Sequence, residues 1–291
     1  MAAEGYGFLG LGIMGLAMAK NLLALGVPLT VWNRSPDKCA ALVELGATAA
    51  KTPAEVVLKS KITFAMLADP AVALTVALGA GGVLEALTPG KSYVDMSTVD
   101  AETSATIGRA ITAKGARFLE APVSGSKKPA EDGQLVILAA GDESLFHDAT
   151  GAFDVMGKKS FYLGETGNGA KMKLVVNMIM GSMMTAFAEG LSLAEKAGLD
   201  KSDLLDVLDL GAIANPMFKL KGPSVIKGNF PPAFPLKHQQ KDMRLALALG
   251  DEVAQTMPVA AAANEVFKKA RNLGLGDNDF SAVYKAVTDS S

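Results

Sequence analysis

The chain carries near its start the stretch Gly7-Phe8-Leu9-Gly10-Leu11-Gly12-Ile13-Met14-Gly15. It joins an apolar run, which predicts a β-strand over Tyr6–Leu11, to a run typical of a helix over Gly15–Leu25. Three glycines at this spacing suit a tight turn, a close approach of the backbone to a pyrophosphate, and close packing of helix on strand. The N–H groups at the start of the helix attract phosphate. A dinucleotide site is therefore expected, and an ordinary glycine-rich turn is the simpler alternative. The expected cofactor contacts in this stretch are Gly10, Leu11, Gly12, Ile13, Met14 and Gly15.

The end of the second predicted strand, Leu29–Trp32, is expected to select the cofactor. NAD-binding versions of this turn place Asp or Glu there, where the carboxylate accepts hydrogen bonds from the ribose 2′-hydroxyl. This chain has Asn33-Arg34-Ser35 instead, so no carboxylate repels a 2′-phosphate and the Arg34 guanidinium can pair with one. We expect NADP, bound as NADPH, with Asn33, Arg34 and Ser35 as contacts. The alternative is that Arg34 is a solvated surface residue.

Short β-type runs alternate with helix-type runs over the first part of the chain. The β-type runs are Tyr6–Leu11, Leu29–Trp32, Ile62–Leu67, Ser92–Asp95, Arg117–Glu120, Gln134–Ala139 and Ser160–Leu163. Such alternation predicts an α/β fold of the Rossmann type, with a doubly wound parallel sheet. Beyond Gly169 the β signal disappears, and segments 170–197, 201–210, 237–250 and 258–273 read as helices. An irregular loop is expected around Pro223, Pro231, Pro232 and Pro235. We therefore expect an NADP-binding domain over residues 1–165 and an all-helical domain over residues 166–291.

Composition excludes several classes of function. The net charge is −2 and the 28 basic residues are scattered, so neither nucleic acid nor an anionic membrane surface is expected as a partner. Cys39 is the single cysteine, which excludes a disulfide within the chain and suits a reducing compartment. The two histidines, His147 and His238, lie far apart, so no metal site is expected. Polar residues interrupt the longest apolar run, Leu174–Leu193, which favours a buried helix over a membrane span. We expect a cytoplasmic protein, or one of chloroplast or mitochondrion whose transit peptide has been removed.

Two further strand ends carry polar residues. Ala121-Pro122-Val123-Ser124-Gly125-Ser126 follows the strand Arg117–Glu120, and ligands of open α/β sheets gather beyond the carboxyl ends of strands. The two hydroxyls and the N–H groups of Ser124, Gly125 and Ser126 suit a substrate carboxylate, although a simple turn is equally consistent. Thr98 is expected beside the cofactor, and Ser97, Thr98 or Asp100 could cap the next helix; both roles can hold at once. Met66 and Leu67, at the end of the third β-type run, are also expected cofactor contacts.

An apolar run begins at Lys173, just after the glycine-rich turn of residues 164–169. Lys173 and Asn177 are four residues apart and share one helix face. A buried ammonium group is costly unless it is paired or used. Lysine can donate a proton to a carbonyl oxygen as hydride arrives, and desolvation can bring its pKa near neutrality. Lys171 lies about 200° round the same helix, so spacing alone does not choose between the two lysines.

The segment Lys237–Asp242 places polar residues at the start of an otherwise apolar helix. These side chains could reach an active site, but a capped helix start with solvated charges is the preferred interpretation. The methionine-rich residues 177–184 are interpreted as core or subunit packing, because methionine fills irregular gaps.

Several separated motifs together resemble those of the β-hydroxyacid dehydrogenase family, over the whole chain. More narrowly, they resemble its glyoxylate/succinic semialdehyde reductases from plants. The motifs that carry the resemblance are residues 7–15, 95–98, 121–126, 167–177 and Lys241-Asp242. The resemblance implies a Rossmann domain and a helical domain joined by one long helix, with homodimers or homotetramers formed through the helical domains.

The same resemblance implies roles for individual residues. The family pattern Gly-x-Gly-x-x-x-Lys-x-x-x-Asn, begun at Gly167, selects Lys173 as the general acid and leaves Lys171 outside. The implied substrate contacts are Ser124, Gly125, Ser126, Asn177, Phe234 and Asp242. Thr98 would lie by the nicotinamide, and Lys241 would contact the cofactor.

The resemblance implies an enzyme that reduces small carboxylate-bearing aldehydes with NADPH, which is a detoxifying reaction. Glyoxylate would give glycolate, and succinic semialdehyde would give 4-hydroxybutyrate. One alternative is an NAD(P)-dependent dehydrogenase of the 3-hydroxyisobutyrate type. Another is a catalytically silent NADP-binding interaction protein, because some relatives lack the lysine and act as chromatin-associated binding proteins. The presence of Lys173 argues against the silent alternative.

Overall fold

The computed structural model describes residues 5–289. Contacts divide them into two compact units, which we name unit 1 (residues 5–173) and unit 2 (residues 174–289). The division falls inside one helix, and the sequence-based boundary at residue 165 stays a prediction. The two units are described separately below.

Unit 1 contains a mixed sheet with the strand order β3-β2-β1-β4-β5-β6-β8-β7, and β9 pairs with β8. The strands are β1 (Gly5–Leu9), β2 (Leu29–Trp32), β3 (Thr48–Ala49), β4 (Ser60–Ala65), β5 (Ser92–Asp95), β6 (Arg117–Glu120), β7 (Val123–Ser124), β8 (Leu135–Gly141) and β9 (Gly157–Tyr162). Strands β1 to β6 run parallel to one another. The order reverses between β1 and β4, and open α/β sheets bind ligands outside the carboxyl ends of the strands at such a point.

One strand departs from the parallel arrangement of the predicted doubly wound sheet, and this strand is β8. This strand pairs antiparallel with both β6 and β7. A parallel return needs a crossover of about a dozen residues or more, usually helical. Here the connection between β6 and β8 contains only β7 and the short helix α7 (Lys127–Glu131) and forms no such crossover. The chain therefore enters β8 in the direction opposite to β6.

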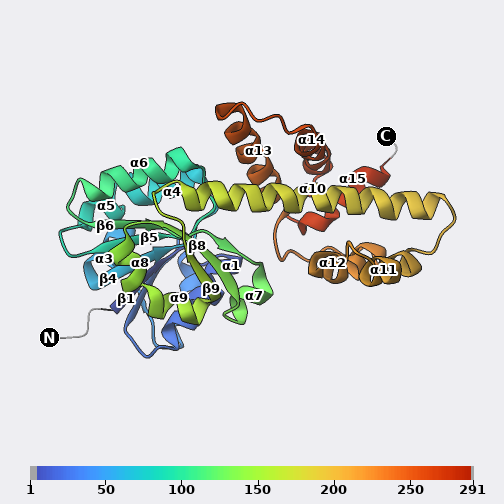
Figure 1. Ribbon diagram of the computed structural model, residues 1–291. Helices are drawn as coiled ribbons and strands as arrows, with labels where there is room; N and C mark the ends of the chain where they lie inside the picture. The colour runs from blue at the N-terminus through green and yellow to red at the C-terminus, as the bar shows by residue number, and fades with distance from the viewer. Residues whose placement is uncertain (1–4, 290–291) are drawn as a thin grey trace. The chain divides into compact units, whose positions relative to one another are not determined.

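Helices cover both faces of the sheet in unit 1 (Figure 1). They are α1 (Ile13–Leu23), η1 (Pro36–Cys39), α2 (Ala40–Val43), α3 (Pro53–Lys59), α4 (Pro70–Leu78), α5 (Val83–Ala86), α6 (Ala101–Thr112), α7, α8 (Glu143–Asp148) and α9 (Thr150–Met156). Successive residues of a strand enter different cores: Phe8 and Val94 belong to one cluster, and Leu9 and Tyr93 to the other. This alternation is the period-two geometry of a strand, and it explains why both faces need helices.

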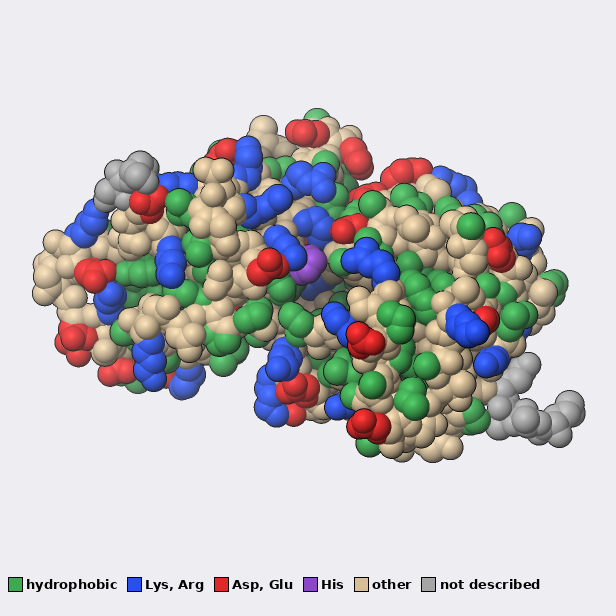
Figure 2. All heavy atoms as spheres, turned by 180° about the vertical axis from the view of Figure 1, so that it is seen from behind, with side chains coloured by type: hydrophobic (Ala, Val, Ile, Leu, Met, Phe, Trp, Pro, Cys, Tyr) green, Lys and Arg blue, Asp and Glu red, His purple; other side chains and the backbone are tan. Residues whose placement is uncertain are grey.

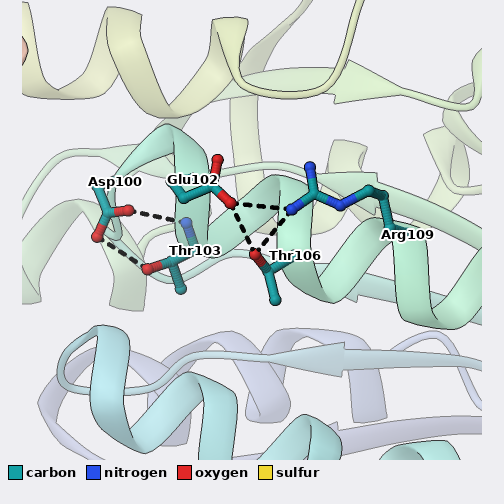
Figure 3. A network of polar contacts seen from close by, with 5 residues as sticks. All are labelled: Asp100, Glu102, Thr103, Thr106 and Arg109. Atoms are coloured by element: carbon teal, nitrogen blue, oxygen red, sulfur yellow. Dashed lines mark hydrogen bonds and ion pairs between the residues drawn. The ribbon is translucent and has the colours of Figure 1, made fainter. Parts of the chain in front are cut away.

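Short polar side chains set where several of these helices begin. Asp100 caps α6, because its carboxylate accepts from the Thr103 N–H and the Thr103 hydroxyl, both at 2.8 Å (Figure 3). Along the same helix Glu102 accepts from Arg109 at 2.9 Å. Of the three expected capping candidates Ser97, Thr98 and Asp100, Asp100 is therefore the N-cap of α6.

Unit 2 is helical. Its elements are the greater part of α10 (Asn168–Lys196), then α11 (Lys201–Leu210), α12 (Pro216–Ile226), α13 (Leu236–Glu252), α14 (Pro258–Asn272), η2 (Phe280–Ala282) and α15 (Val283–Thr288). Its core gathers residues of α10, among them Met184 and Phe187, with Phe267 and Phe280. By length and composition alone α10 could cross a membrane, and 44% of its most apolar 18-residue window is buried.

The irregular loop that we expected around Pro223 is wrong at that residue, which lies inside α12. Proline removes one helical hydrogen bond. The apolar face of α12 offsets this loss, because Val225 is buried and the Phe218 ring stacks on Phe187 with centroids 4.4 Å apart. Pro231, Pro232 and Pro235 do lie in the connection between α12 and α13.

Candidate functional site

The three glycines of the turn between β1 and α1 have three different environments. Gly10 has a φ of +92°, and a Cβ atom there would lie 2.4 Å from the Met66 carbonyl oxygen. A Cβ on Gly15 would lie 1.9 Å from the Gly10 carbonyl oxygen. At Gly12, the N-cap of α1, a Cβ would meet nothing within 4 Å, and no side chain caps the helix. Gly10 and Gly15 are thus needed for packing, whereas Gly12 leaves open space in front of helical N–H groups, which fits a pyrophosphate.

Asn33 ties the end of β2 to the glycine turn. Its Oδ1 accepts from the Leu11 N–H at 2.9 Å, and its Nδ2 donates to the Ser35 carbonyl at 2.9 Å. The Arg34 side chain is exposed and has no polar partner among residues 5–289. An uncommitted guanidinium beside the turn fits a 2′-phosphate. Asn33, which was expected to contact the cofactor, thus uses both the oxygen and the nitrogen of its side-chain amide in hydrogen bonds to the backbone of these loops.

Hydrogen bonds join the carboxyl ends of β1, β4 and β5. The Met66 N–H donates to the Leu9 carbonyl at 2.9 Å, and the Leu67 N–H donates to the Ser97 hydroxyl at 2.9 Å. Asp95 in turn accepts from the Ser97 N–H at 2.9 Å, while burial raises the pKa of the Asp95 carboxyl. Met66, Leu67 and the half-buried Thr98 therefore lie around the switch point of the sheet.

The loop Ser124–Ser126 leads from β7 into α7. Ser124 pairs with Val136 of β8, and Gly125 has a φ of +133°, which favours glycine. A Cβ at Gly125 would also lie 2.7 Å from a methyl group of Leu135. Among residues 5–289 the hydroxyls of Ser124 and Ser126 have no hydrogen-bond partner. The loop is thus held by its backbone and keeps two hydroxyls for a ligand.

Sequence reasoning missed Glu120, a buried carboxylate at the start of α10. Its Oε1 accepts from the N–H groups of Gly167 at 2.8 Å, Gly169 at 2.7 Å and Ala170 at 3.2 Å. The Ser104 hydroxyl donates to its Oε2. Burial raises the pKa of Glu120, and the hydrogen bonds oppose that rise. The feature of the sequence that could have pointed to Glu120 is an acidic residue at the end of the predicted strand Arg117–Glu120.

Burial separates the two lysines near the start of α10. Lys173 is buried, with 5% of its surface exposed, whereas Lys171 is exposed. Asn177, one turn further along the same helix, is also buried. This arrangement agrees with the pattern that selected Lys173 and set Lys171 aside.

In unit 2 Gln239, Gln240 and Asp242 are buried and Lys241 is half-buried, so the preferred interpretation of a solvated helix start is wrong for these residues. Asp242 Oδ2 accepts from Asn177 Nδ2 at 2.6 Å, and Asp242 Oδ1 lies 3.0 Å from Lys241 Nζ. Gln239 Nε2 donates to the Asn177 carbonyl at 2.8 Å. These contacts pair the Asp242 carboxylate and the Gln239 Nε2 group, whereas Gln239 Oε1 has no hydrogen-bond partner among residues 5–289. The structure therefore brings together Asn177, Lys241 and Asp242.

Phe234 is held by a different set of contacts. Its N–H and that of Ala233 donate to Asp279 Oδ2 at 3.2 Å each, and the Phe234 carbonyl accepts from the Phe280 N–H at 2.9 Å. Lys221 Nζ lies 2.8 Å from each Asp279 oxygen, and both residues are buried. Sequence reasoning missed this ion pair, since its members are 58 residues apart.

Two family models cover almost the whole chain. Residues 5–164 match the NAD binding domain of 6-phosphogluconate dehydrogenase. Residues 167–287 match the NAD-binding model of NADP-dependent 3-hydroxyisobutyrate dehydrogenase. The chain belongs to the β-hydroxyacid dehydrogenase family. Its predicted α/β fold, its membership of this oxidoreductase family and NADP as its cofactor are thereby confirmed.

Relatives in this family are similar over nearly the full chain. Glyoxylate/succinic semialdehyde reductase 1 of Arabidopsis thaliana is 70% identical, over 97% of this chain and 97% of that protein. The chloroplastic reductase 2 of the same plant is 59% identical, over 97% of this chain and 78% of that protein. Among solved structures, 3-hydroxyisobutyrate dehydrogenase from Salmonella typhimurium superposes with a TM-score of 0.89 at 28% identity, covering 97% of this chain and 99% of that one.

Proposed function

We propose that this β-hydroxyacid dehydrogenase reduces small aldehydes that carry a carboxylate, using NADPH. Glyoxylate would give glycolate, and succinic semialdehyde would give 4-hydroxybutyrate. The identity of 70% to a plant reductase named for both substrates supports this choice. The single observation that carries the chemistry is the burial of Lys173 one turn before the buried Asn177 on α10.

NADPH, when bound, supplies a hydride to the aldehyde carbon. The carbonyl oxygen gains negative charge in that step and needs a proton. Lys173 donates this proton from its ammonium group, so that the aldehyde, one hydride and one proton give the alcohol. Asn177 orients the reacting end of the substrate, and its own amide is held by Asp242.

The substrate carboxylate is assigned to the loop Ser124–Ser126. Two observations support this assignment. The hydroxyls of Ser124 and Ser126 have no partners among the described residues, and Gly125 has a positive φ and carries no side chain. Phe234 and Asp242 are assigned to the wall of the substrate pocket. Arg34 is assigned to the 2′-phosphate of NADPH, and Thr98 and Lys241 to further cofactor contacts.

Three absorbance assays, one for each candidate substrate, test the proposal. NADPH consumption is followed by absorbance with glyoxylate and with succinic semialdehyde, and NADP⁺ or NAD⁺ reduction is followed with 3-hydroxyisobutyrate. We expect turnover with both aldehydes, and loss of turnover with retained NADPH binding in Lys173→Ala. Turnover with 3-hydroxyisobutyrate alone would favour the dehydrogenase alternative. NADPH binding without any turnover would favour the silent alternative.

We further propose that the protein associates into homodimers or homotetramers through unit 2. Large apolar side chains are exposed there, including Val207, Leu210 and Leu220, and such groups mark association surfaces when they lie together. Both basic and acidic side chains lie on the face shown in Figure 2, and the net charge of −2 supports a small-molecule partner over nucleic acid or a membrane. The proposed location is the cytoplasm, with chloroplast or mitochondrion as alternatives. Light scattering of the purified protein would give the number of subunits.

A further inference from the structure

The start of α10 is attached to the sheet of unit 1 through one carboxylate. Glu120 ends β6 and is 2% exposed, and its Oε1 receives three backbone N–H groups at 2.8, 2.7 and 3.2 Å. These N–H groups belong to Gly167, Gly169 and Ala170. The first turn of a helix leaves such groups without intrahelical partners. Glu120 therefore caps α10 from a strand 47 residues away.

The hydrogen bonds also affect the charge of this group. Every polar group that touches Glu120 within the described residues donates to it: three N–H groups and the Ser104 hydroxyl. A protonated carboxyl would keep the three N–H groups on Oε1 and would donate its own hydrogen bond from Oε2 to the Ser104 hydroxyl. The three N–H groups and the positive end of the helix dipole stabilise the ionised form, whereas burial opposes it and raises the pKa of Glu120.

The glycines that precede Lys173 follow from this contact. A Cβ on Gly169 would lie 2.4 Å from the Leu138 carbonyl oxygen and 3.0 Å from Glu120 Oε1. Gly167 has a φ of +104°, which favours glycine, and its N–H donates to the carboxylate at 2.8 Å. The first turn of α10 is therefore fixed between β6 and β8. There is no space for a side chain at Gly169.

Lys173 lies three residues beyond the last N–H group that Glu120 holds, or about 4.5 Å along the helix axis. Within one helix turn the backbone transmits a displacement almost rigidly. We propose that Glu120 is a positioning residue for Lys173: by anchoring the first turn of α10, it fixes the height and rotation at which the ammonium group meets the carbonyl oxygen. This inference rests on the proposed function, in which Lys173 is the general acid.

The test uses Glu120→Gln, which keeps an acceptor oxygen but removes the charge, in the full-length protein. Neutral hydrogen bonds are roughly half as strong as charge-assisted ones. A misplacement of about 1 Å can cost about 100-fold in rate. We expect kcat for glyoxylate to fall about tenfold, with the KM values for glyoxylate and NADPH within about twofold of wild type, when kcat is normalised to sites counted by NADPH titration.

The matched control is Asp142→Asn. Asp142 caps α8 in the same unit, accepting from the Leu145 N–H at 2.8 Å, and has no part in the proposed site. We expect it to leave the normalised kcat unchanged. A second readout compares Glu120→Gln in the Lys173→Ala background, where it should lower the residual turnover less than twofold because the group that it positions is already gone.

Three results would overturn the inference: an unchanged normalised kcat in Glu120→Gln, a loss that appears only in KM, or an equal loss in the presence and absence of Lys173. Failure of the proposed function looks different. If Lys173→Ala keeps wild-type turnover, the general-acid assignment fails and this inference fails with it. If Lys173→Ala loses turnover and Glu120→Gln behaves like Asp142→Asn, the positioning role alone is wrong.

Discussion

Replacement of Asp279 by Ala should destabilise unit 2 more than any single change to its partner Lys221. The carboxylate lies 2.8 Å from Lys221 Nζ through both oxygens and also accepts from the N–H groups of Ala233, Phe234 and Ser281. Removing one member of a buried pair leaves an uncompensated charge, at a cost of about 3–5 kcal/mol. In Asp279→Ala the ammonium keeps, among residues 5–289, the Phe280 ring 5.2 Å away.

Lys221→Met should cost less, about 1–3 kcal/mol, because Asp279 keeps its backbone donors and methionine fills the apolar path of the lysine stem. The two changes should not add. Once the ammonium is gone, removal of the carboxylate leaves no buried charge, so the double variant should be more stable than the sum predicts by about 1–3 kcal/mol.

Urea unfolding with two probes measures these effects. Trp32 is the single tryptophan and lies in unit 1, whereas far-ultraviolet circular dichroism also reports the helices of unit 2. The matched control is Lys219→Met, on the same helix α12 as Lys221, which breaks an exposed pair with Asp209 of α11. We expect no measurable shift there, since exposed pairs contribute little. Equal midpoints for Asp279→Ala and the control, or strict additivity in the double variant, would refute the reasoning.

Further variants test the cofactor site and one buried acid. Arg34→Ala should raise the KM for NADPH roughly tenfold or more and leave that for NADH nearly unchanged, and equal effects in steady-state assays would contradict the 2′-phosphate assignment. Gly12→Ala should fold normally but bind NADPH weakly in a fluorescence titration, whereas Gly15→Ala should lower the melting temperature because its Cβ would lie 1.9 Å from the Gly10 carbonyl oxygen. Burial raises the pKa of Asp95, so the folded state holds its proton more tightly than the unfolded state and loses stability as pH rises through that raised pKa. The free energy of unfolding of Asp95→Asn, relative to wild type, should therefore increase from about pH 4 to about pH 7, and a constant or falling difference would show that the carboxyl is not desolvated.

Local pattern was enough to predict the long elements of the fold. The strands Leu29–Trp32, Ser92–Asp95 and Arg117–Glu120 and the helix Lys201–Leu210 lie where the sequence predicts them, because their periodicity and flanking residues are strong. The two-residue strands β3 and β7 were not predicted. Two residues carry no periodicity, and β3 exists only because Thr48 and Ala49 pair with the distant Thr30 and Val31.

The candidate site divides in the same way. The glycine turn and the spacing of Lys173 and Asn177 are local, and the sequence predicts them. Glu120 and the Lys221–Asp279 pair were not predicted, because the burial of a charged residue depends on partners that fold beside it from far along the chain. The prediction for the segment Gln239–Asp242 was wrong for the same reason. Its polar residues predict a solvated helix start, because the sequence does not show that Asp242 and Gln239 bond to the side-chain amide and the carbonyl of Asn177.

Helix α10 runs without interruption from Asn168 to Lys196 and bears both Lys173 and Asn177. One residue inserted or deleted between them would swing Asn177 about 100° around the helix, away from the face that it shares with the lysine. Surface loops of such a protein can lengthen or shorten as its descendants diverge, but this stretch cannot. Engineers who exchange the helical half between relatives must therefore make the joint outside these five residues, or compensate in whole turns.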